Sequence, residues 1–245
     1  IFQKPFGNNS TVNLDNPDVL VHGGFDNAVF SGVFQETVKR LRWLKLKHPF
    51  YKLYTTGHSL GAANSILTAT GLAMRGYSVV SINFGCPKTG NKEWENFLNA
   101  TSPLNSKLGI WRVVLGWDLV ARLPEFFHHV GHTIQLWGED HAKYNEGDPD
   151  IVECYYRHYG NEELGYASVP SGWNAKPYAW MPGALSSHFV QKYVEYLEIL
   201  SQKKLWVDHF KRIQPIGYDD DIYDEPPDDW YGVDADYQVE ATRIS

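Results

Sequence analysis

A serine in the first third of the chain has neighbours of the type and spacing that make a nucleophile. Ser59 is the centre of the pentapeptide GHSLG, residues 57–61, which is a G-x-S-x-G pattern. The segment YKLYTTG, 51–57, precedes it and is predicted as a strand, and a stretch rich in Ala, Leu and Thr over 60–75 follows and is predicted as a helix, so the two elements join at the serine. A serine held on such a turn is exposed for attack on a carbonyl carbon. The pattern therefore predicts acyl transfer through Ser59.

The residues on either side of Ser59 have predicted roles of their own. Gly57, His58 and Gly61 complete the elbow, in which the two glycines prevent collisions with the neighbouring strand and helix. The backbone N–H of Leu60 lies at the predicted helix start, where the positive end of the helix dipole stabilises a developing oxyanion. We therefore expect Leu60 to supply a donor of the oxyanion hole.

Serine alone is a poor nucleophile, so the prediction requires a base and an acid that orients it, in the chain order Ser, Asp or Glu, His. Asp118 follows the apolar run 110–117, at the carboxyl end of a predicted strand, where parallel sheets present functional groups. His188 directly precedes an amphipathic stretch with Val190 and Val194 among its apolar residues. We predict a triad of Ser59, Asp118 and His188.

Other histidines also lie beyond Asp118, and three of them are closely spaced. The group formed by His128, His129 and His132 raises the possibility of a metal site. However, 128–137 is predicted as a strand, in which this spacing does not make three imidazoles converge. The sequence therefore predicts no metal site, and acyl transfer by a serine triad requires no cofactor.

The elements that would position these residues alternate along the chain. We predict strands over 18–22, 51–57, 78–85 and 110–117, one helix that starts at Val29 and is ended by His48-Pro49, and a second helix over 60–75. Such alternation indicates an α/β fold with a mainly parallel sheet and helices on both faces.

Composition limits the partners and the domain organisation. A length of 245 residues suits one main domain, predicted over 1–213, followed by an acidic tail rich in Pro and Tyr over 214–245. A net charge of −7 argues against a nucleic-acid partner, and no apolar run is long enough for a transmembrane segment. Cys86 and Cys154 lie in no metal-binding pattern, and we expect free thiols rather than a bridge.

Several of these motifs together resemble the fungal-type class 3 lipases. The similar stretches are VHGGFDNAV, TTGHSLGAA, VVSINFGCPKTGN, WRVVLGWDLVARLP and HHVGHTIQLW, in the same order and spacing. The resemblance implies an α/β-hydrolase fold, a lipid or other acyl ester substrate, transient lipid-interface contact, Ser59 as nucleophile and Asp118 as acid. The base in this family often follows an Asp, which holds for His141 but not for His188, so His141 is a reserve candidate.

Two departures from the family pattern bear on activity. The elbow continues GAA where GGA is common, and the chain lacks the upstream strand whose RGT-like loop supplies the second oxyanion donor. We therefore expect either an N-terminally incomplete chain or a protein that has lost part of its machinery. The alternative to an ester hydrolase is accordingly a catalytically impaired, lipase-like binding module. The sequence leaves the cellular location open.

Overall fold

The computed structural model describes residues 3–7, 16–98, 104, 106–116, 118–137, 153–157 and 185–202. The acidic segment 214–245, the domain boundary expected before it and the reserve base His141 lie outside the described residues.

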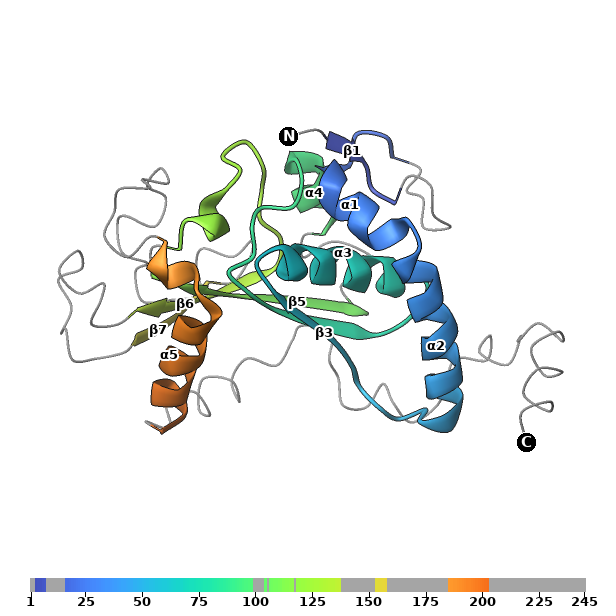
Figure 1. The fold of residues 1–245 in the computed structure, drawn as a ribbon. Coiled ribbons are helices and arrows are strands. Elements are labelled where there is room, and N and C mark those ends of the chain that lie inside the picture. The colour runs from blue at the N-terminus through green and yellow to red at the C-terminus, as the bar shows by residue number, and fades with distance from the viewer. Residues whose placement is uncertain are drawn as a thin grey trace, which may run out of the picture.

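A five-stranded sheet forms the centre of the molecule (Figure 1). Its strands lie side by side in chain order: β3 (Leu53–His58), β4 (Val79–Phe84), β5 (Leu108–Leu115), β6 (His132–Trp137) and β7 (Glu153–Arg157). The first four are parallel, and β7 runs antiparallel to β6. The predicted strands over 51–57, 78–85 and 110–117 correspond to β3, β4 and β5.

The register of the parallel strands brings their carboxyl ends to one edge of the sheet. His58, the last residue of β3, pairs with Phe84, and Phe84 in turn pairs with Val113 of β5. Ser59 directly follows β3, and Asp118 comes three residues after the end of β5. Two residues that are far apart in sequence therefore meet at the same edge.

Helices cover both faces of the sheet, and each face has its own apolar core. On one face lie α1 (Gly23–Phe30), α2 (Val33–Lys47) and α3 (Leu60–Met74), with side chains such as Phe34 and Ile66 packed together with Val79. On the other face, Tyr193 and Tyr196 of α5 (Val190–Gln202) pack with Val80. Because side chains alternate along a strand, Val79 and Val80 belong to opposite faces. The predicted α/β fold with a mainly parallel sheet covered on both faces is confirmed.

Helix α3 begins directly after Ser59, and most of its residues are buried. Its small residues allow close packing: a methyl group on Gly71 would lie 2.8 Å from the Phe34 ring. The helix ends before Gly76, whose φ of +89° is a conformation that favours glycine. This termination agrees with the predicted end of the helix near Arg75.

The first predicted strand and helix differ from the structure. Strand β2 (Leu20–His22) does not join the parallel sheet and instead pairs antiparallel with β1 (Gln3–Pro5), because it is only three residues long and continues directly into α1. The single helix predicted from Val29 is two helices, because Gly32 has a φ of +149° that interrupts helical geometry between α1 and α2. Its predicted end at His48-Pro49 agrees with the end of α2 at Lys47.

Three short helical segments complete the described structure: α4 (Lys92–Phe97), η1 (Val120–Arg122) and η3 (Ser186–His188). The segment η1 follows Asp118, and η3 contains His188, so both border the edge at which Ser59 lies. Over the part of the chain that the structure describes, none of the helices combines the length and apolar character needed to span a bilayer.

Candidate active site

Ser59 lies on a strained turn between β3 and α3. Its φ of 57° is the only positive φ of a non-glycine residue among those described, and its N–H donates to the Phe84 carbonyl at 3.0 Å. A methyl group on Gly57 would lie 2.2 Å from the carbonyl oxygen of Gly61, so the turn requires glycine at position 57. Left-handed backbone at a serine costs free energy, and such strain is typical of nucleophile elbows.

Gly61 does not have the steric role predicted for it. A methyl group built on Gly61 meets no atom within 4 Å, and the residue has no left-handed φ. The prediction of a collision at this position was wrong, because the first turn of α3 faces open space there. Leu60 is the first helical residue, so its N–H belongs to the group of donors that have no acceptor within the helix.

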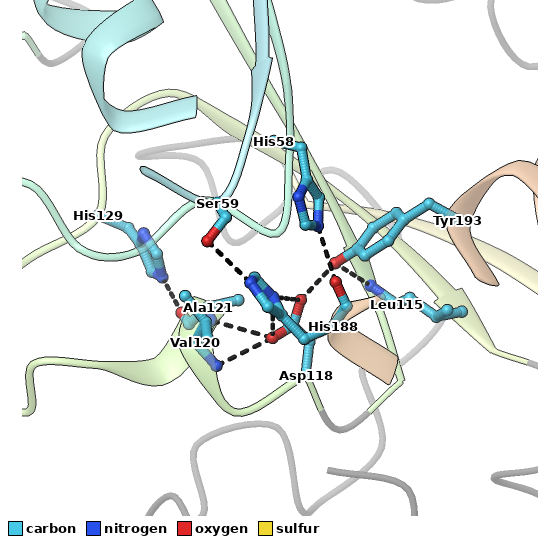
Figure 2. Close-up of polar contacts among 9 residues, drawn as sticks. All are labelled: His58, Ser59, Leu115, Asp118, Val120, Ala121, His129, His188 and Tyr193. Carbon is cyan, nitrogen blue, oxygen red and sulfur yellow. Dashed lines mark hydrogen bonds and ion pairs between the residues drawn. The ribbon is translucent and has the colours of Figure 1, made fainter. Parts of the chain in front are cut away.

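His188 bridges Ser59 and Asp118 (Figure 2). Its Nε2 is 2.8 Å from Ser59 Oγ, and its Nδ1 is 3.0 Å from each oxygen of the Asp118 carboxylate. Because a carboxylate oxygen accepts, Nδ1 carries the proton and Nε2 is left as the acceptor for the serine hydroxyl. The three residues predicted as a triad are therefore brought together in a hydrogen-bonded chain.

The Asp118 carboxylate is completely buried, and donors surround it. Oδ1 accepts from the backbone N–H groups of Val120 at 2.9 Å and Ala121 at 3.3 Å, while Oδ2 accepts from the Tyr193 hydroxyl at 2.7 Å. A buried negative charge is tolerated when such donors replace water. The backbone donors arise because η1 begins directly after Asp118 and aims its first N–H groups back at the carboxylate.

Tyr193 is a site residue that sequence analysis missed. Besides donating to Asp118, its hydroxyl accepts from the Leu115 N–H at 3.1 Å. Burial, and then the neighbouring Asp118 charge, raise the pKa of Tyr193 well above its ordinary value, so the hydroxyl stays protonated as a donor. A tyrosine on the apolar side of the helix after His188 was the available signal, but this pattern equally describes a core residue.

Gly85 was also missed, and it lies at the centre of the triad. Its φ is +56°, and a methyl group there would lie 2.8 Å from Asp118 Oδ2 and 3.1 Å from His188 Nδ1. The carboxylate and imidazole can therefore meet only above a residue without a side chain. The adjacent Cys86 has a fully buried thiol that is free, which confirms the expected free thiol at this position.

The three closely spaced histidines have separate partners. His128 Nδ1 lies 2.8 Å from Glu95 Oε2, His129 Nε2 donates to the Ala121 carbonyl at 2.6 Å, and the His132 ring stacks on Trp111. Burial, followed by the charge of Arg112, lowers the pKa of His129 well below its ordinary value. Within the described ranges, no group of three His, Cys, Asp or Glu side chains is placed to hold a metal ion.

A parallel sheet whose nucleophile elbow, acid and base meet at the carboxyl edge defines an α/β hydrolase fold. The family described as lipase (class 3) matches residues 2–128, just over half of the 245 residues. The chain belongs to the class 3 lipase family.

Individual relatives align with parts of the chain. The secreted mono- and diacylglycerol lipase LIP4 of Malassezia restricta is 32% identical over a 171-residue alignment that covers 60% of this chain and 53% of the relative. The secreted mono- and diacylglycerol lipase 1 of Fusarium solani is 31% identical over 113 residues, 46% of this chain and 32% of the relative. The Lip2 lipase structure of Yarrowia lipolytica has a TM-score of 0.48 at 21% identity, over 55% of this chain and 49% of that one. The chain spans 20% to 53% of the length of the curated relatives it matches.

Proposed function

We propose that this chain is a serine hydrolase that cleaves carboxylic esters of lipids through Ser59, His188 and Asp118. The observation that carries the proposal is the pair of contacts made by the His188 ring. Its Nε2 is 2.8 Å from Ser59 Oγ while its Nδ1 is 3.0 Å from both oxygens of Asp118. This arrangement has the geometry required of a base that removes a serine proton and of an acid that orients the base.

In the first step, Ser59 Oγ attacks the ester carbonyl carbon as His188 Nε2 takes its proton. The resulting imidazolium is stabilised by Asp118, whose carboxylate holds Nδ1–H throughout. The tetrahedral intermediate collapses when the alcohol leaves with the proton from Nε2, and an acyl-serine ester remains. The Leu60 N–H, at the positive end of α3, is the proposed donor to the oxyanion.

In the second step, water replaces the alcohol. His188 Nε2 accepts a proton from water as the hydroxide attacks the acyl-serine carbonyl, and then returns the proton to Ser59 Oγ. The products are a carboxylic acid and a regenerated enzyme. All the acid and base chemistry passes through His188, whose ring nitrogens lie 2.8 Å from Ser59 Oγ and 3.0 Å from Asp118 Oδ1.

A second oxyanion donor would be supplied from the outer edge of β3. In the described structure β3 is the edge strand of the sheet, with β4 as its neighbour on one side. A parallel strand added at the outer edge of β3 would end beside Ser59, where its following loop can offer an N–H. Loss of one such donor costs about 10² to 10³ in rate, so the test includes a form that carries additional N-terminal sequence.

The lipid nature of the ester is supported by apolar residues beside the triad. Leu60 follows the nucleophile and is 53% exposed, while Leu185 and Phe189 flank His188 at 63% and 61%. Large exposed apolar side chains gathered at a site favour an apolar substrate or a transient contact with a lipid interface. Relatives named as mono- and diacylglycerol lipases point to acylglycerols, and one Arabidopsis thaliana relative is named a phospholipase A1.

The test is hydrolysis of p-nitrophenyl esters with short and long acyl chains. We would compare the 245-residue chain, a form extended with its natural upstream sequence, and Ser59→Ala in each. We expect activity in the extended form that Ser59→Ala abolishes, with preference for long chains if the substrate is a lipid. If only the 245-residue chain is inactive, the difference in hydrolysis rate between the two forms is attributed to the second oxyanion donor. Silence in both forms would overturn the proposal in favour of a lipase-like binding module.

A further inference from the structure

His58 lies against the segment that carries the base. It is the last residue of β3, and its ring centroid is 4.7 Å from that of His188 and 5.8 Å from that of Tyr193. Its Nε2 is 2.7 Å from the backbone carbonyl oxygen of His188 (Figure 2). Because a carbonyl oxygen can only accept, Nε2 carries the proton and His58 is the donor.

We propose that His58 is a positioning residue that fixes the backbone of the base relative to the nucleophile. The proposal rests on the function proposed above, in which His188 is the base. His58 and Ser59 are adjacent in the chain, so the bond ties the backbone of His188 to the turn that holds the serine. The two connected residues are 130 positions apart in sequence.

The bond has a function that the other contacts of His188 do not provide. Asp118 and Ser59 both contact the imidazole ring, so they orient the ring without fixing the main chain from which it extends. Two backbone bonds of η3, from His188 N–H to the Leu185 carbonyl and from Phe189 N–H to the Ser186 carbonyl, are local and do not join the segment to the sheet. His58 supplies a long-range contact to the backbone itself.

The side chains around His188 give this segment little apolar anchorage. Leu185 and Phe189, on either side of η3, both keep more than half of their surface exposed, although Ser187 is buried. A short segment held by few buried apolar groups depends on its polar contacts for its position. A displacement of about 1 Å in a reacting group is enough to reduce a rate roughly 10²-fold.

The experiment compares two substitutions of His58 in the full 245-residue chain. His58→Gln keeps an amide donor at about the reach of Nε2, whereas His58→Phe keeps an aromatic ring and removes the donor. The control is His48→Phe, since His48 is an exposed histidine that stacks on Tyr51. Two measurements are made: the rate at which a fluorophosphonate probe labels Ser59, and amide hydrogen exchange in the peptide that spans 185–192.

We expect His58→Phe to slow labelling by about 10- to 100-fold, with a probe affinity within threefold of the parent, and to speed exchange over 185–192. His58→Gln should recover both within about fivefold, and His48→Phe should change neither. Equal losses in His58→Gln and His58→Phe, or no loss in His58→Phe, would overturn the proposal. If Ser59 is labelled neither in the parent chain nor in the extended form, the proposed function fails, whereas the exchange data still test the role of His58.

Discussion

A methyl group on Gly85 would lie 2.8 Å from Oδ2 of Asp118, closer than any carbon can approach a carboxylate without displacing it. The same methyl group would lie 3.1 Å from Nδ1 of His188, so the contact between acid and base passes directly over the Gly85 backbone. The φ of +56° adds a conformational cost to any side chain at this position.

Gly85→Ala should therefore reduce ester hydrolysis by about 10²-fold or more and lower the free energy of unfolding by about 1 to 3 kcal/mol. Gly61→Ala is the matched control, because a methyl group there meets no atom within 4 Å. We expect that variant to keep its activity and to gain about 0.5 to 1 kcal/mol of stability, since alanine favours a helix. Equal effects from the two substitutions, measured by ester hydrolysis and urea unfolding, would contradict this assignment.

Tyr193→Phe should remove one hydrogen bond to the Asp118 carboxylate while leaving the carboxylate itself in place. The substitution keeps the buried ring but removes the donor to Asp118 and leaves the Leu115 N–H without its acceptor. We expect a cost of about 1 to 3 kcal/mol in the free energy of unfolding, because buried polar groups lose their partner. Activity should fall about tenfold, consistent with one bond to the triad acid. Tyr54→Phe is the control, because Tyr54 is an exposed residue of β3. If Tyr193→Phe changes neither activity nor the free energy of unfolding, Tyr193 does not support Asp118.

Asp118→Asn should lower kcat by about 10³- to 10⁴-fold while the fold remains intact. A carboxylate has two oxygens that can accept from Nδ1–H, whereas an amide has only one. When the amide nitrogen faces Nδ1, the ring carries its proton on Nε2 and can no longer accept a proton from Ser59. Steady-state kinetics, with circular dichroism to check the fold, measure this directly. A loss of less than tenfold would mean that another group orients His188.

The buried thiol of Cys86 should make the free energy of unfolding depend on pH in alkaline solution. Complete burial raises the pKa of its thiol from 9.0 to about 12. The protonated form is therefore favoured by folding, and its stabilisation is fully present below pH 9 and declines as pH rises towards 12. Between these values the decline is about 1.4 kcal/mol per pH unit. Urea unfolding of the parent and of Cys86→Ala from pH 8 to 11 measures it, and a constant difference between them would contradict the prediction.

The elbow and the acid could be predicted because their signals are local. G-x-S-x-G at a strand-helix junction identifies Ser59, and Asp118 follows an apolar strand whose end must lie at the same edge as Ser59. The high content of Ala, Leu and Thr over 60–75 also predicted α3 to within one residue. In each case a few consecutive residues contain the physical cause.

The residues that support the triad could not be predicted, because their causes are distant in sequence. Gly85 is required by Asp118 and His188, and Tyr193 reaches Asp118 across 75 positions. The break between α1 and α2 escaped prediction for another reason: the helical spacing of apolar residues continues through Gly32 even though its backbone does not. A single glycine in such a pattern is often tolerated within a helix.

The distance of 129 positions between His188 and Ser59 also has a consequence for protein synthesis. Chains emerge from the ribosome from the N-terminus and fold as they appear. A nascent chain that has grown as far as β6 already contains the elbow and Asp118, yet it has no His188 with which to activate the serine. In the proposed mechanism, ester cleavage therefore begins only after α5 has been made and has docked on the sheet, and a prematurely terminated chain would carry an inert serine.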